Sequence, residues 1–234
     1  MFVAYRTSEL VAPPEWQRFR IKNVTTSVNR GIAPNYSDEP TGVLAFSQKC
    51  IQADREVDPS QGRHQVPDDE LLASDALLRP LDVVINSTGT GTLGRAGLIS
   101  TSLIDEYPPL VADGHVTIVR FDERFCRARY GWYLLSTDVF YRFANEALAV
   151  GSTNQMELGR EAIRRMAILL PPVARQDELV DWLDKKCDKV SGLLQEIGAG
   201  QAAPGGLAHF LTEHREALIT AAVSGHLDMK RSAS

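Results

Sequence analysis

The chain has 234 residues, of which 44% are hydrophobic and 24% are charged, a composition typical of a globular protein with enough length to form a core. It contains no apolar run of roughly 18 residues and no signal-peptide pattern at its start, which argues against a membrane-spanning helix and against secretion. The net charge of −5 argues, taken alone, against a nucleic-acid partner.

The cysteines and histidines indicate neither disulfides nor a metal site. Cys50, Cys126 and Cys187 are odd in number, far apart, and contain no C-x-x-C pair. His64 has no second histidine or cysteine near it in the sequence, so we expect no metal. Reduced thiols of this kind predict a cytoplasmic protein.

The first third of the chain alternates between short strands and polar loops. An alternating segment at 16–24 and the apolar run Val43–Phe46 predict strands, whereas Asn29–Pro40 and Gln52–Ser74 are predicted to be loops. The second strand ends in a polar, positively charged segment, which suits contact with DNA. The candidate DNA-binding residues here are Arg30, Gln48 and Lys49.

The stretch Leu81–Ser100 contains a glycine-rich loop between two apolar segments. Gly89 to Gly94 fits the dinucleotide-binding pattern G-x-G-x-x-G, but that reading requires a helix to begin at Gly94. The residues after Gly94 are more typical of a second strand, so we predict a strand, a glycine turn and a strand. Glycines let the backbone approach another surface, and hydroxyls can bond phosphate or base edges. The candidates here are Ser87, Thr88, Thr90 and Arg95.

The following segment continues the globular region to Pro171-Pro172. His115–Phe121 is rich in β-branched residues and predicts a strand, and the apolar spacing of Tyr130–Leu148 predicts one or two helices. Ala149–Gln155 is a small polar loop whose side chains suit contacts with phosphates or bases. Its candidate DNA-binding residues are Ser152, Asn154 and Gln155.

After Pro172 the sequence becomes helical in character. Apolar residues repeat at intervals of three and four, as in a coiled-coil seam. The seam consists of Leu179, Leu183, Cys187, Val190, Leu194 and Ile197, and a second segment from Leu207 contributes Leu211 and Leu218. Gly198–Gly206 should break the helix, leaving either a local interruption or a hairpin. The seam would pair with another chain or lie against its own domain. We therefore predict an α+β fold with a globular domain at 1–170 and a helical region at 171–234.

The chain resembles the specificity subunits of type I restriction–modification systems. The signature loop VVINSTGTGTLGRAG carries the resemblance, together with other stretches in the family's order. These are SQKCI (Ser47–Ile51), HVTIVR (His115–Arg120), GSTNQMEL (Gly151–Leu158), LPPVARQ (Leu170–Gln176) and EHREALITAAVSGHLD (Glu213–Asp228). The break at Gly198–Gly206 departs from the family's single long helix.

The resemblance implies a non-catalytic subunit with one DNA target-recognition domain and one helical spacer, where longer family members have two of each. It implies double-stranded DNA and methyltransferase subunits as partners, and restriction subunits through them. S-adenosylmethionine, ATP and Mg²⁺ would then act in those partners, with no cofactor in this chain. A second copy would give an interrupted palindromic site, and a different half-subunit an asymmetric one. Two alternatives are a decoy that occupies methyltransferase subunits and a nucleotide-binding enzyme that uses the Gly89–Gly94 loop.

Overall fold

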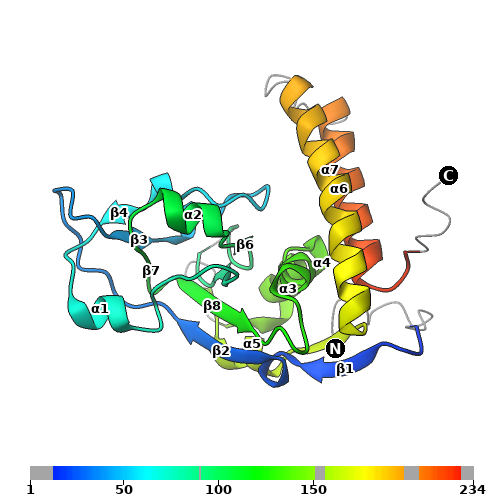
Figure 1. The fold of residues 1–234 in the computed structure, drawn as a ribbon, viewed down its shortest axis with the longest axis horizontal. Coiled ribbons are helices and arrows are strands. Elements are labelled where there is room, and N and C mark those ends of the chain that lie inside the picture. Colours follow the sequence, from blue (N-terminus) through cyan, green and yellow to red (C-terminus); the bar gives the residue numbers. More distant parts are fainter. Residues whose placement is uncertain (1–12, 90, 151–155, 198–205, 228–234) are drawn as a thin grey trace.

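The computed structural model describes residues 13–89, 91–150, 156–197 and 206–227. Strands and short helices form a mixed body from which two long helices project side by side (Figure 1), so the predicted α+β class is confirmed. The strands are β1 (Gln17–Arg20), β2 (Thr25–Arg30), β3 (Leu44–Phe46), β4 (Arg63–His64), β5 (Val83–Asn86), β6 (Ala96–Leu98), β7 (Leu110–Ala112), β8 (Val116–Phe121), β9 (Ala149–Val150), β10 (Glu157–Leu158) and β11 (Ala167–Leu170).

Short helical segments connect most of the strands. The short segments are η1 (Ile21–Asn23), η2 (Gln48–Cys50), η3 (Pro59–Gln61), α1 (Asp69–Ala73), α2 (Thr101–Glu106), α3 (Ala128–Leu135), α4 (Asp138–Phe143), the π-helical turn η4 (Ala144–Leu148) and α5 (Arg160–Arg165). The two long helices are α6 (Val173–Ile197) and α7 (Leu207–Val223). No helix in the described ranges is long and apolar enough to cross a membrane.

The described strands form four sheets, of which β1-β11 and β9-β10 have two strands each and the other two are larger. Of these two, the larger sheet has the strand order β2-β8-β5-β6 and is antiparallel throughout. The smaller has the order β4-β3-β7, with β3 and β7 parallel. Every residue of β5 is buried, because one side of the larger sheet packs on α3 and the other on β3 and β7. This sandwiching explains the continuous apolar run Val83–Ile85, which lacks the alternation of a half-exposed strand.

The glycine-rich loop is the turn of the β5–β6 hairpin. Val83 pairs with Leu98 and Ile85 with Ala96, so a strand, a turn and a strand occupy this stretch, as predicted. Gly89, Gly91 and Gly94 have positive φ angles of 92°, 82° and 91°, a region that glycine enters without steric cost. No helix begins at Gly94, and β6 follows instead, which contradicts the dinucleotide-binding alternative.

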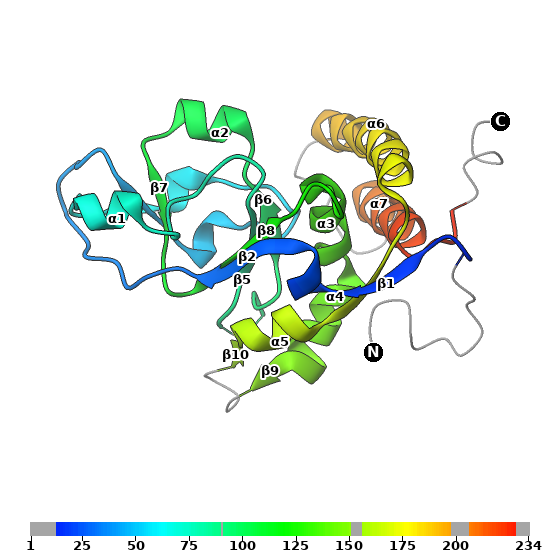
Figure 2. The same ribbon diagram turned by 60° about the horizontal axis from the view of Figure 1, so that its bottom comes forward.

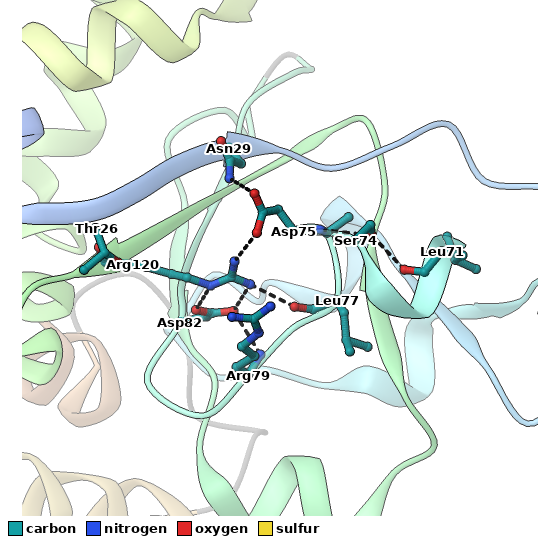
Figure 3. Close-up of polar contacts among 10 residues, drawn as sticks. Thr26, Asn29, Leu71, Ser74, Asp75, Leu77, Arg79, Asp82 and Arg120 are labelled. Atoms are coloured by element: carbon teal, nitrogen blue, oxygen red, sulfur yellow. Dashed lines mark hydrogen bonds and ion pairs between the residues drawn. The ribbon is translucent and has the colours of Figure 1, made fainter. Parts of the chain in front are cut away.

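An ion pair between β8 and the residue before β5 ties the hairpin to the preceding segment (Figure 3). Arg120 donates from Nε and Nη2 to the Asp82 carboxylate at 2.8 and 3.0 Å, and from Nη2 to the Leu77 carbonyl at 2.8 Å. Asp75 lies farther from Arg120, at 3.5 Å, and accepts from Asn29 Nδ2 at 3.0 Å. The Asp82 side chain is only 3% exposed, so this pair holds the start of β5 in place.

The two long helices form a hairpin. α6 ends at Ile197 and α7 begins at Leu207, and both figures place them side by side (Figure 2), so the helical region folds back on itself. The start of α6 and the end of α7 belong to the same core cluster as α3 and the larger sheet. The helical region and the strand-containing region therefore share one hydrophobic core.

This arrangement corrects part of the predicted partner seam. Leu179, Leu183 and Val190 are buried inside the chain and cannot contact a second one. The reason is that α3 and α7 cover this face of α6, the reading in which the helix lies against its own domain. The other seam residues keep partial exposure: Cys187, Leu194, Ile197, Leu211 and Leu218.

Candidate nucleic-acid interface

The glycine turn is held in one shape by α4 and the turn after it. Tyr141 donates its hydroxyl to the Gly91 carbonyl at 2.9 Å, and Asn145 Nδ2 donates to the Leu93 carbonyl at 2.8 Å. A Cβ added at Gly94 would lie 2.9 Å from the Ala144 Cβ, closer than side-chain carbons approach. These contacts hold Gly91, Leu93 and Gly94 against α4 and η4.

A polar hollow of about 390 Å³ lies between this turn and the loop that follows β3. Three glutamines, one lysine, one arginine, one threonine, one aspartate and one isoleucine line it. They are Gln48, Lys49, Ile51, Gln52, Asp58, Gln61, Thr92 and Arg95, and we call this set the polar hollow. Three of the predicted DNA-binding residues thus meet in one place, although up to 47 positions separate them in the sequence (48 to 95).

Gln48 and Lys49 lie on the short turn η2, which corrects the prediction of a strand end. The Ser47 hydroxyl caps this turn by accepting from the Lys49 backbone N–H at 3.2 Å, a local signal that favours a turn over a strand. Lys49 is exposed. The Gln48 Oε1 is buried beside Gly89 and has no hydrogen-bond partner in the described part of the chain.

Asp58 orders the opposite wall of the polar hollow. Its carboxylate accepts from the Ser60 hydroxyl at 2.6 Å and from Gln61 Nε2 at 3.0 Å, and these hydrogen bonds lower the pKa of Asp58. Gln52 Nε2 likewise donates to the Lys49 carbonyl at 2.8 Å. Sequence reasoning missed Gln52 and Gln61 individually, and the only signal for them was the polar loop Gln52–Ser74.

Arg95 has few contacts with its own chain. Among the described residues its guanidinium makes one hydrogen bond, a long one of 3.4 Å from Nη2 to the Gly91 carbonyl. The side chain is half-buried and forms no ion pair within those residues. Most of its donors therefore remain for an external acceptor.

Two predicted contact residues instead hold the fold together. Arg30 donates to the Gly114 carbonyl at 2.7 Å and the Leu158 carbonyl at 3.2 Å, and pairs with Glu157 at 2.8 Å. Ser87 is fully buried, and its hydroxyl lies 2.6 Å from the Thr117 hydroxyl. Their donors are used internally, so we remove both from the candidate interface.

Thr88 and the remaining candidates lie elsewhere. The Thr88 hydroxyl is 2.8 Å from His115 Nδ1 at the edge of the turn, where it keeps partial exposure. Thr90, Ser152, Asn154 and Gln155 lie outside the described residues.

The polar hollow has the chemistry of a surface that reads base edges. Glutamine amides can pair with adenine N6 and N7, and arginine or lysine can pair with guanine O6 and N7. Residues 13–89, 91–150, 156–197 and 206–227 contain no cluster of metal-ligating side chains.

Comparisons with known proteins indicate the fold. No family model and no curated protein matches the sequence. A solved structure on complex assembly and conformational transition of the type I restriction–modification system contains a chain with a TM-score of 0.59 and 17% identity, and the match covers 94% of this chain and 49% of that chain. The crystal structure of the HsdS subunit from Thermoanaerobacter tengcongensis matches with a TM-score of 0.53 and 14% identity over 80% of this chain and 46% of that chain. The chain therefore has the fold of the HsdS specificity subunit of type I restriction–modification systems, over about half the length of the chains it matches.

Proposed function

We propose that this chain is the DNA-recognition component of a type I restriction–modification complex and has no catalytic role of its own. The observation that carries the proposal is the polar hollow on a fold like that of HsdS. It places the donors of Lys49 and Arg95 beside the glycine turn, together with three glutamines. Two of these, Gln52 and Gln61, also donate hydrogen bonds within the chain. Amides and guanidinium groups are what direct readout of bases requires.

In this proposal the chemistry belongs to partner subunits. Methyltransferase subunits would bind S-adenosylmethionine and methylate adenine, and restriction subunits joined through them would use ATP and Mg²⁺. The net charge of −5 fits this division, because much of the phosphate attraction can then come from the partners.

The test is fluorescence anisotropy with duplex DNA that contains the methylated sequence, measured with and without the methyltransferase subunit. Arg95→Ala should weaken binding in the complex by about tenfold or more, since a bidentate contact to guanine contributes about 1–3 kcal/mol. Arg63→Ala is the matched control, because Arg63 is 58% exposed and stacks on Tyr36 at 4.1 Å.

Two other results of the anisotropy experiment would change the proposal. Unchanged affinity in Arg95→Ala removes Arg95 from the interface. Assembly with the methyltransferase subunit without any DNA binding would favour the decoy alternative and contradict the proposal.

We further propose that two such chains pair through the outer part of the α6–α7 hairpin. Three large apolar side chains are exposed there, with Leu193 at 39%, Leu207 at 58% and Phe210 at 67%. The half-exposed seam residues Leu194 and Leu211 lie beside them in the sequence. About half of each solved neighbour lies outside the match, which leaves room for a second unit of this size.

Light scattering after size-exclusion chromatography tests the pairing. We expect a dimer at micromolar concentration and about tenfold weaker association for Phe210→Ser, since a buried aromatic contributes about 1.5–3 kcal/mol. A single-chain species that stays single when mixed with its methyltransferase would contradict this. A homodimer predicts an interrupted palindromic site, and an asymmetric site would instead indicate pairing with a different half.

A further inference from the structure

A second hollow lies between the loop residues Asp54 to Val57, α2, α3 and the α6–α7 hairpin. Its volume is about 360 Å³, at the small end of the range for ligand pockets. Three arginines line it, and we call it the arginine pocket: Arg55 from the loop, Arg129 from α3 and Arg215 from α7.

Two of these arginines have their charge compensated within the chain. Arg55 pairs with Glu216 and donates from Nε to the Ser136 carbonyl at 3.0 Å. Arg129 pairs with Asp184 at 2.7 Å. Neither therefore calls for an external partner.

Arg215 differs from both. It is only 8% exposed, and in the described part of the chain it forms no ion pair and its Nε has no hydrogen-bond partner. Of the guanidinium nitrogens, only Nε is buried without a partner. A largely buried cation without a counter-charge loses part of its hydration, which is unfavourable. The position is thus consistent with a partner group that is not part of this chain.

A second unpaired donor lines the same pocket. The indole N–H of Trp132 is buried and has no acceptor in the described ranges. Two buried donors, one of them charged, call for an acceptor that is negatively charged, such as a carboxylate or a phosphate.

The charge at the rim of the pocket favours a carboxylate over a phosphate as the acceptor. Asp54, Glu56 and Asp188 line it and are exposed, and within the described chain none of them pairs with Arg215. Three carboxylates repel the phosphates of DNA but attract cationic side chains. A carboxylate with positive charges on either side fits both the centre and the rim.

We infer that the arginine pocket receives an acidic side chain of a protein partner, flanked in that partner by basic residues. The carboxylate would pair with Arg215 and accept from the Trp132 indole, while the flanking cations face Asp54, Glu56 and Asp188. This inference rests on the proposed function only in expecting a protein partner near the helical hairpin.

The experiment follows the Trp132 indole N–H by NMR in the full-length chain during titration with acetyl-Lys-Glu-Lys-amide. The chain has three tryptophans, and Trp132→Phe assigns the signal by removing it. Hydrogen bonding to the carboxylate should shift that signal downfield, and the matched peptide acetyl-Lys-Gln-Lys-amide should bind at least tenfold more weakly.

Arg215→Gln keeps the size of the side chain and removes its charge, so it should reduce binding of the glutamate peptide by at least tenfold. Arg63→Gln, on β4 and not among the residues that line the pocket, should leave binding unchanged. If Arg215→Gln fails to fold, Trp132→Phe must still weaken binding several-fold. Because this variant lacks the indole signal, its binding is measured from the shift of a backbone amide in the pocket.

Three results would overturn the inference: equal shifts from the two peptides, no saturable shift from either, or tighter binding of inorganic phosphate than of the glutamate peptide. DNA affinity is measured separately, so each of these outcomes is distinct from failure of the proposed function.

Discussion

Two arginines, Arg120 in β8 and Arg95 just before β6, differ in how many of their donors the chain itself uses. The Arg120 side chain is 12% exposed and donates hydrogen bonds to Asp82 and the Leu77 carbonyl. Arg95 donates one long hydrogen bond to its own chain within the described residues. The first arginine maintains the shape of the domain, and the second leaves its donors for something outside it. The sequence predicts Arg120 inside a strand and Arg95 next to one, and the difference between them depends on contacts that form after folding.

The largest effect should come from breaking the Arg120 pair. Asp82→Asn leaves Arg120 largely buried without its counter-charge, which should cost about 3–5 kcal/mol in the free energy of unfolding. Urea denaturation measures this directly. Asp75→Asn is the control, because Asp75 is 68% exposed and lies 3.5 Å from Arg120, so it should cost less than about 1 kcal/mol. Equal losses in both variants would mean that Asp82 has no special role.

Stability and DNA binding measured on one pair of variants distinguish an arginine that supports the fold from one that contacts DNA. Arg30→Gln should lower the free energy of unfolding by about 2 kcal/mol, because the carbonyl oxygens of Gly114 and Leu158 lose the donor that Arg30 provides. Arg95→Gln should change stability by less than about 0.5 kcal/mol and weaken DNA binding instead. A stability loss in Arg95→Gln as large as that in Arg30→Gln would show that both arginines are structural.

The glycine turn offers a smaller effect. Gly94→Ala combines a positive φ with a contact of 2.9 Å to Ala144, so we expect a loss of about 2 kcal/mol. Gly91 has a similar φ but open space around it, so Gly91→Ala should lose only about 1 kcal/mol. Thermal unfolding measures both variants. Equal losses of stability in the two would show that the contact between Gly94 and Ala144 in η4 does not constrain the turn.

The smallest effect concerns the buried side of the turn that carries Gln48 and Lys49. Burial raises the pKa of the Cys50 thiol to about 11, from an ordinary value of 9.0. The folded state therefore keeps a proton that the unfolded chain loses, so this contribution to stability is complete below pH 9 and is lost as the pH rises towards 11. Between pH 8 and 10 the wild type should lose about 1 kcal/mol more than Cys50→Ala in urea denaturation. Parallel pH profiles would contradict this.

Local sequence signals predicted part of the fold, whereas the short elements β4 and α1 lie in a stretch that was predicted to be a loop. β-branched runs marked β5 and β8, glycines marked the hairpin turn, and the Gly198–Gly206 break allowed the helical hairpin. Each of these depends on residues close together in the chain. The seam of α6 was ambiguous for the opposite reason, because its periodicity is the same whether the covering helix belongs to this chain or to another.

The site was less predictable, because it depends on distant contacts. The sequence predicts Arg30 as a contact residue, yet its acceptors at Gly114 and Leu158 lie 84 and 128 positions away. Gln61 enters the polar hollow only because Asp58 orients its amide and β5–β6 brings Arg95 opposite. No spacing rule in one sequence connects such residues.

If the polar hollow contacts the bases of the recognition site, changes in its side chains should alter the DNA sequence that is methylated. The most direct test is to map methylated adenines in the genome of cells that carry this chain with its methyltransferase subunit, comparing the wild type with Gln48→Ala and Arg95→Ala. We expect one bipartite motif for the wild type, and loss or relaxation of defined base positions in the variants. An unchanged motif at full occupancy in both variants would contradict this expectation.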